Sequence, residues 1–356
     1  MLPYYLLIAV PFLASGLLSK IKELSQKRTK IFMFIFFAIF LALVACRDLS
    51  IGVDNLNYKY YFEKFASVGW AQCFTSDIEP GYALLCKVVS LFTDNYQVFV
   101  AVVAIISIIP VARFYAKETE MPLLTMAFFL GVFPFSMYFS GLRQVVAMAF
   151  VFPALKYVEN KKLFKFILTV LLATLFHQSS FLILALYPVY HFKITPKKLM
   201  VIVPMLAILL ALNKQIFNIG LSILGGKYLD KYGAEQSTGA YTMIILFAIM
   251  LIYSFVMVNE NDLTDREKSL RNILFLIFAI QCFAPLNTVV MRLNYYFLVL
   301  APVIMSKLAK KSTLKWGDVS RIVSFTICAF FIAYFILKMH TGEDILKIYP
   351  YKAFWQ

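Results

Sequence analysis

Long apolar stretches separated by short polar ones dominate this chain from one end to the other. A membrane-spanning helix needs about 20 mainly apolar residues, roughly 17–25. Several of the stretches fall short of that length, with residues 163–212 the weakest part, so tilted or re-entrant segments are expected there. The twelve candidate spans are Leu2–Leu18, Ile31–Ala45, Val98–Tyr115, Leu123–Phe139, Val145–Tyr157, Leu163–Phe176, Phe181–Val189, Leu199–Leu212, Tyr241–Val258, Ile273–Val290, Leu293–Leu308 and Ile322–Leu337.

Composition supports the same conclusion. The chain is 62% hydrophobic and only 15% charged, whereas soluble domains are about 45–50% apolar. In lipid, a helix satisfies the hydrogen bonds of its own backbone groups. The sequence lacks the alternation of polar and apolar residues that is typical of the strands of a membrane β-barrel. We therefore predict an all-α integral membrane protein forming a single polytopic domain over residues 1–356, with about 12 (10–12) transmembrane helices.

The distribution of basic residues predicts the orientation. Six alternate loops, around residues 20–30, 113–121, 156–165, 191–199, 259–272 and 307–321, hold 22 of the 34 Lys and Arg residues. The positive-inside rule assigns these loops to the cytoplasm. Both termini are then expected outside it. The net charge of +15 has the same explanation, so nucleic acid is not an expected partner.

Three regions on the predicted outer side are more than connections. The longest is the outer loop 46–95, in which Pro80–Thr93 suits an interfacial or re-entrant helix. Residues 213–240 begin with an amphipathic part and continue through Gly225-Gly226, which favours a mobile flap. The tail 339–356 is rich in Tyr and Trp, as interfacial anchors are.

Ionisable groups at the outer membrane edge need an explanation, because the positive-inside rule disfavours basic residues there. Arg47, Arg143 and Arg292 are predicted at one depth, and guanidinium groups suit phosphate oxygens. They form a candidate diphosphate-binding clamp, with snorkelling to lipid headgroups as the alternative. His177 is a candidate general base, although an interfacial histidine bonded to Ser179, Ser180 or a backbone carbonyl is the simpler interpretation of this residue taken alone.

Carboxylates and tyrosines complete the candidate site. Asp48, Asp54 and Glu79 can orient a sugar hydroxyl, accept its proton or pair with an arginine. Their spacing does not indicate a metal site, and no cofactor is expected. Candidate sugar-binding residues are Tyr58, Tyr61, Tyr82, Gln144 and Tyr296, although aromatic belts are the commoner reason for tyrosines at an interface.

In order along the chain, these residues resemble the EpsG family. The resemblance rests on Arg47-Asp48-x-x-Ile51-Gly52-x-Asp54-x-x-Asn57-Tyr58-x-x-Tyr61-Phe62, Glu79-Pro80-Gly81-Tyr82, Gly141-x-Arg143-Gln144, His177-Gln178-Ser179-Ser180 and Arg292-x-x-x-Tyr296-Phe297. It implies a Wzy-type polymerase of O-antigen, capsule or exopolysaccharide, with a glycosyltransferase C-like fold, in the bacterial inner membrane. It further implies that polyprenyl-diphosphate-linked oligosaccharides serve as donor and acceptor.

The expected reaction joins two lipid-linked repeat units at the outer face, with the lipid diphosphate as leaving group. The three arginines would stabilise the charge of that leaving group without a metal, and His177 or Glu79 would accept the acceptor's proton. Membrane lipids are expected partners, and a chain-length regulator and a flippase are further candidates. Two other functions remain open at this point: a lipid-linked glycan flippase or transporter, and a membrane acyltransferase that modifies glycans.

Overall fold

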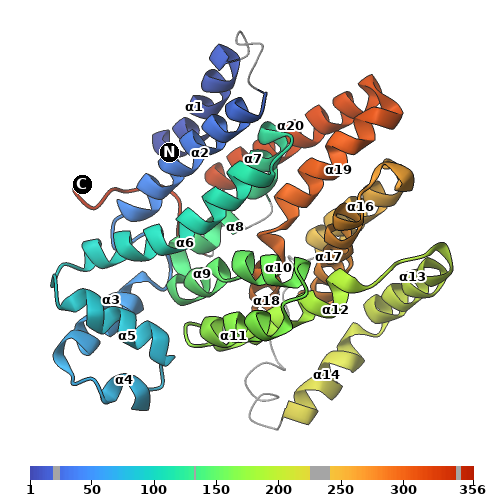
Figure 1. The fold of residues 1–356 in the computed structure, drawn as a ribbon. Helices are drawn as coiled ribbons and strands as arrows, with labels where there is room; N and C mark the ends of the chain where they lie inside the picture. Colours follow the sequence, from blue (N-terminus) through green and yellow to red (C-terminus); the bar gives the residue numbers. More distant parts are fainter. Residues whose placement is uncertain (19–24, 132–133, 225–240, 342–345) are drawn as a thin grey trace. The chain divides into compact units, whose positions relative to one another are not determined.

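The computed structural model describes residues 1–18, 25–131, 134–224, 241–341 and 346–356, and within these ranges the fold is helical (Figure 1). A single isolated β-bridge joins Arg47 to Ala353 in the described part of the chain. The chain separates into two compact units, residues 1–183 with 321–356, and residues 184–320. Each is described by itself.

Unit 1 carries the N-terminal helices and the last long helix. Its elements are α1 (Leu2–Leu18), α2 (Ser25–Ala45), α3 (Asn55–Ser67), α4 (Gln72–Thr75), α5 (Pro80–Ser90), α6 (Tyr96–Glu118), α7 (Pro122–Gly131), α8 (Pro134–Ser140), α9 (Leu142–Ala149), α10 (Val151–Glu159), α11 (Leu163–Thr174) and α20 (Asp318–His340), with the 3-10 helix η1 (Gln178–Ala185) at the boundary. Its core is strongly aromatic. The rings of Phe40 and Phe129, for example, lie 5.3 Å apart, centroid to centroid.

The central helix of unit 2 is α17 (Asp265–Gln281), which contacts most of the other helices of this unit. Its first half is rich in charged residues and its second half is apolar. A capping box starts this helix, because Thr264 and Glu267 bond each other's backbone amides. The other elements are α12 (Leu186–His191), α13 (Pro196–Ala211), α14 (Asn213–Leu224), α16 (Tyr241–Val256), η2 (Glu260–Asp262), α18 (Thr288–Leu298) and α19 (Ala301–Trp316). Helix α14 forms the start of the segment 213–240. The rest of that segment, residues 225–240, lies outside the described residues, and the flap stays a prediction.

The expectation of an apolar helical membrane protein is met in its coarse form. Among the described residues, three helices are long and apolar enough to cross a membrane: Lys27–Ala45 within α2, α6 and α20. Two bent pairs raise this to five, since α13 and α14 meet at 77° and α18 and α19 at 50°. The count of twelve is not confirmed, because several predicted spans are short or broken helices. Helices α9 and α10, however, continue one another through Phe150, which has helical backbone angles.

The C-terminal tail packs against the start of the outer loop. The amide of Asp48 donates to the carbonyl of Lys352 at 2.9 Å, and that of Gly52 donates to Lys347 at 2.9 Å. The Tyr4 hydroxyl of α1 donates to the carbonyl of Ile348 at 2.5 Å. The tail therefore holds the loop through its backbone, while Trp355 stays exposed; its role as an interfacial anchor stays a prediction.

Candidate functional site

A buried asparagine shapes the first turn of the outer loop. Asn55 is 1% exposed, and its side-chain nitrogen donates to the carbonyls of Leu49 and Ile51, at 3.2 Å each, and of Asp48 at 3.4 Å. Its side-chain oxygen accepts a 2.5 Å bond from the Tyr96 hydroxyl. Sequence reasoning missed this residue. The available signal was an amide side chain, able to donate and accept at once, directly after Asp54.

Gly52 brings this loop against the end of α8. Its φ of +96° is a conformation that other residues rarely adopt, and a Cβ built there would lie 2.0 Å from the carbonyl oxygen of Phe139. This close approach leaves Asp54 beside the next residue, Ser140, whose hydroxyl donates to the Asp54 carboxylate at 3.4 Å. The close approach at Gly52 therefore places the Asp54 carboxylate at the junction of α8 and α9.

Gly81 likewise allows a close backbone contact, at the start of α5. Its amide donates to the Leu175 carbonyl at 2.8 Å, and an added Cβ would lie 2.7 Å from that oxygen. Because Pro80 occupies the first position of α5 and Glu79 its N-cap, the contact fixes the Glu79 side chain next to the turn that follows α11.

Glu79 lies at the centre of the resulting cluster. One carboxylate oxygen is 2.5 Å from Nη1 of Arg143, and the other accepts a 3.2 Å bond from the backbone amide of Gln178. The side chains of Glu79 and Arg143 are 10% and 27% exposed, so the ion pair is largely shielded but reachable. Three segments far apart in the sequence, at residues 79, 143 and 178, therefore meet at one carboxylate.

Tyr58 packs against the arginine of this pair. Its phenol interacts with the Arg143 guanidinium, and burial raises the pKa of the Tyr58 hydroxyl above its usual value. The ring also lies 5.7 Å from that of Tyr82. At neutral pH Tyr58 is consequently a neutral hydrogen-bonding group beside the ion pair.

His177 lies next to the Gln178 amide that bonds Glu79. Its Nδ1 is 2.6 Å from the Ser179 hydroxyl, and the ring is only partly buried. The bond to Ser179 matches the simpler of the two interpretations of this histidine. A role of His177 in proton transfer stays a prediction.

Arg47 and Asp48 are placed differently from each other. Arg47 is 1% exposed, its Nη1 donates to the carbonyl of Val44 at 2.5 Å, and burial lowers the pKa of its guanidinium. Asp48 accepts bonds from the Ser50 hydroxyl at 2.6 Å and the Ser50 amide at 3.0 Å, which lower the pKa of its carboxyl. Lys352 of the tail lies 3.7 Å from it.

The remaining candidates fall into two groups. Tyr82 and Gln144 are buried in unit 1, at 0% and 1% exposed, while Tyr61 is half-buried with its ring 5.5 Å from that of Tyr60. Arg292 and Tyr296 belong to unit 2. Arg292 lies between the predicted spans Ile273–Val290 and Leu293–Leu308, but α18 continues through that position and carries Arg292, exposed, in its second turn. The sugar-binding and clamp assignments stay predictions.

Lys87 has a role that sequence reasoning did not anticipate. The Lys87 ammonium donates to the carbonyls of Ala66 and Val68, at 3.0 and 2.7 Å, and so caps the end of α3. Within the described ranges, no group of three His, Cys, Asp or Glu side chains is arranged to hold a metal ion.

Comparison with known proteins gives one match. The sequence model of the EpsG family, a family of Wzy-type polysaccharide polymerases and transferases, matches residues 30–353. No curated protein and no solved structure matches the chain.

Proposed function

Because the chain belongs to the EpsG family, we propose that it joins polyprenyl-diphosphate-linked oligosaccharides at the outer face of the bacterial inner membrane. The family indicates a membrane protein of the polysaccharide-polymerase type. The proposal adds the substrate class, the leaving group and the residues. One observation carries it: the Glu79 carboxylate, held between the Arg143 guanidinium and the Gln178 amide.

In the proposed reaction, a hydroxyl of the acceptor sugar attacks the anomeric carbon of the donor. The new glycosidic bond forms as the bond from that carbon to the lipid diphosphate breaks. The acceptor's proton passes to Glu79, or to His177 on the adjacent turn. A positioned base contributes roughly 10²–10⁴-fold to such a rate.

The ion pair couples the two charge changes of this step. When Glu79 takes up the proton, it loses the negative charge that balances Arg143. The leaving diphosphate gains negative charge in the same step. The Arg143 guanidinium can therefore pair with the diphosphate in place of the Glu79 carboxylate, and it has an anionic partner throughout. Stabilising charge as it develops is usually the largest single catalytic contribution. A divalent metal is then not required, and polymerisation in the presence of a chelator tests that point.

Polymerisation of purified lipid-linked repeat units by the full-length protein in proteoliposomes tests the proposal. Glu79→Gln keeps an oxygen acceptor for Arg143 and Gln178 but cannot take the proton, so we expect a loss of about 10²–10⁴-fold. Arg143→Ala should lose about 10²–10³-fold, and Arg143→Lys should not restore activity, because an ammonium lacks the planar fork.

A matched control is Arg113→Ala, which removes an exposed arginine of α6 and should leave the rate unchanged. Size-exclusion profiles in detergent verify that each variant folds. Wild-type polymer from both Glu79→Gln and Arg143→Ala would overturn the assignment of this site. If the wild-type protein gave translocated lipid or acylated glycan in place of longer chains, it would be a flippase or an acyltransferase instead.

A further inference from the structure

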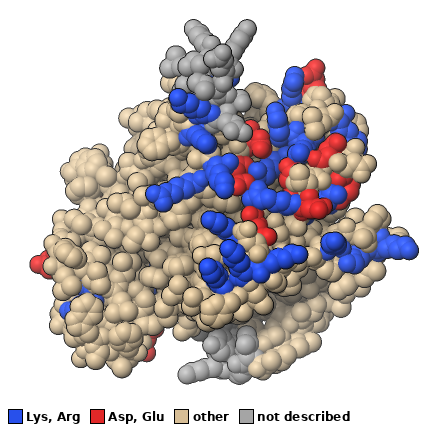
Figure 2. All heavy atoms as spheres, in the orientation of Figure 1, with Lys and Arg blue, Asp and Glu red and all other residues tan. Residues whose placement is uncertain are grey.

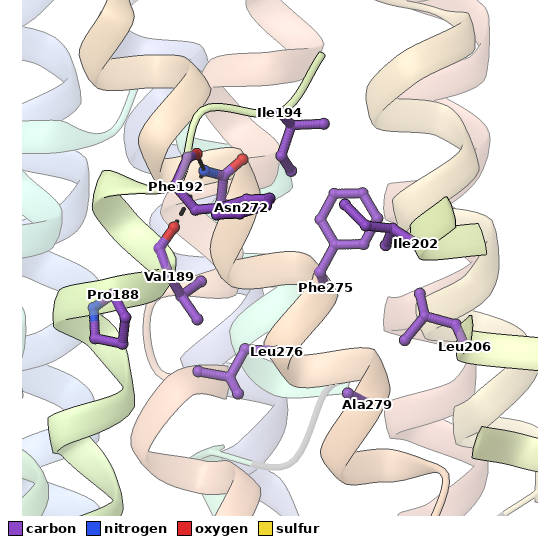
Figure 3. Close-up of a pocket in the computed structure, with 10 residues that line it drawn as sticks. All are labelled: Pro188, Val189, Phe192, Ile194, Ile202, Leu206, Asn272, Phe275, Leu276 and Ala279. Atoms are coloured by element: carbon purple, nitrogen blue, oxygen red, sulfur yellow. Dashed lines mark hydrogen bonds between the residues drawn. The ribbon is translucent and has the colours of Figure 1, made fainter. Parts of the chain in front are cut away.

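Unit 2 contains an apolar cavity between three of its helices. Its volume is about 330 Å³, and it is lined by α12, the turn after it, α13 and α17 (Figure 3). Small-molecule sites in proteins span about 300–1,000 Å³, so the space accommodates a slender ligand. It lies wholly within unit 2.

The lining offers only hydrocarbon to an occupant. Ile202 and Leu206 of α13 lie across from Phe275 of α17 (Figure 3). The one polar side chain is Asn272, whose amide nitrogen already donates to the carbonyls of Val189 at 3.1 Å and Phe192 at 2.6 Å. A polar ligand would therefore find few partners, whereas an alkyl chain matches the lining.

Helix α13 stands at the outer wall of the cavity with little packing of its own. None of its residues is buried, and side chains such as Val203 and Met205, at 57% and 61% exposed, face away from unit 2. In a membrane, a helix as exposed as α13 is surrounded by lipid. A lipid acyl chain is therefore an abundant ligand that can reach the cavity between α13 and α17.

The rim of the cavity is basic. Lys193, Lys197 and Lys198 surround the start of α13, and residues 186–212 contain no Asp or Glu. Lys and Arg side chains gather at the turn into α13 (Figure 2). Lys198 connects the rim to the cavity, because its ammonium lies 4.2 Å from the ring centroid of the lining residue Phe192 and donates to the Lys193 carbonyl at 2.8 Å.

We propose that this cavity and rim form a binding site for an anionic phospholipid. One acyl chain fills the space between α12, α13 and α17, and the headgroup phosphate binds Lys193, Lys197 and Lys198. Basic pockets between membrane helices on the cytoplasmic side suit such headgroups, and these lysines belong to a loop whose charge predicts that side. The bound lipid fastens α13 to the rest of unit 2. The site is separate from the proposed reaction and does not depend on it.

Photo-crosslinking tests the proposal on the full-length protein in nanodiscs. The probe is a phosphatidylglycerol with a diazirine in one acyl chain, compared with a phosphatidylcholine carrying the same chain. We expect the anionic probe to label peptides of α13 and α17 and to be displaced by unlabelled phosphatidylglycerol. Lys193→Gln/Lys197→Gln/Lys198→Gln should weaken labelling on the order of 100-fold, since each lysine near an anionic headgroup is worth about fivefold in affinity.

Two further variants separate charge from shape. Lys156→Gln/Lys161→Gln/Lys162→Gln removes three lysines from another loop and should leave labelling of α13 unchanged. Ala279→Phe fills the cavity while keeping the basic rim, and should abolish labelling. Size-exclusion profiles identify any variant that fails to fold, and Lys198→Gln alone, with an expected fivefold effect, then replaces the triple variant.

Three outcomes would overturn the proposal. Equal labelling by both probes would indicate bulk lipid only. If labelling survived the triple substitution at 193, 197 and 198, these lysines would not bind the headgroup. Displacement by a polyprenyl phosphate at lower concentration than by phosphatidylglycerol would identify the carrier lipid as the ligand.

Discussion

Gly81→Ala isolates the contact that places Glu79. An ideal Cβ at this position would lie 2.7 Å from the Leu175 carbonyl oxygen and 2.9 Å from its Cβ, so backbone has to move. Overpacking of this kind costs about 1–3 kcal/mol, and weakening the bond from the Gly81 amide to Leu175 costs about 0.5–1.5 kcal/mol more. The better helix propensity of Ala returns up to about 1 kcal/mol. We expect a net destabilisation of about 1–3 kcal/mol.

The larger effect falls on activity, because Glu79 is two residues away and bonds both Arg143 and Gln178. Displacing a reacting group by about 1 Å can cost about 10²-fold, so polymer formation should drop on that order. The matched control is Gly220→Ala in α14, where an added Cβ meets nothing within 4 Å. It should keep full activity and a midpoint of thermal unfolding equal to or above that of the wild type. If Gly81→Ala matched this control in both measurements, the positioning argument would be wrong.

Two further predictions concern the outer loop. Asn55→Ala leaves buried carbonyls and the Tyr96 hydroxyl without their partner, so we expect a loss of about 2 kcal/mol in stability, measured by thermal unfolding in detergent. The exposed neighbour Asn57→Ala should change it by less than about 0.5 kcal/mol, and equal losses would contradict the assignment. The Ser50 hydroxyl lowers the folded-state pKa of Asp48 below its unfolded value, so this contribution is present above the unfolded pKa, about 3.9, and is lost as the pH falls through the folded pKa. The difference in unfolding midpoint between wild type and Ser50→Ala should therefore shrink between pH 6 and pH 3, and a constant difference would refute it.

The sequence predicted the kind of fold, an apolar helical membrane protein, because that depends on residue type. Apolar runs identify membrane helices, and the turn residues Gly52 and Pro80-Gly81 mark where the outer loop bends. Pairing across long separations could not be predicted in the same way. Nothing local to Glu79 indicates that Arg143 is its partner, or that Arg47 turns inward to Val44. The exact bounds of short helices, such as the 3-10 helix η1 at Gln178–Ala185, could not be predicted either, since a window of hydropathy records composition and not backbone geometry.

The backbone bonds between the loop 46–95 and the C-terminal tail can form only after the tail has been synthesised. The partners of Asp48 and Gly52 lie about 300 residues later in the chain, and at about 5–20 residues per second they emerge roughly 15–60 s after the loop itself. For that interval the amides of Asp48 and Gly52 lack their tail partners. A chain interrupted before residue 347 would lack these two partners, so the final arrangement of the segment that we propose to do the chemistry depends on residues translated about 300 positions later.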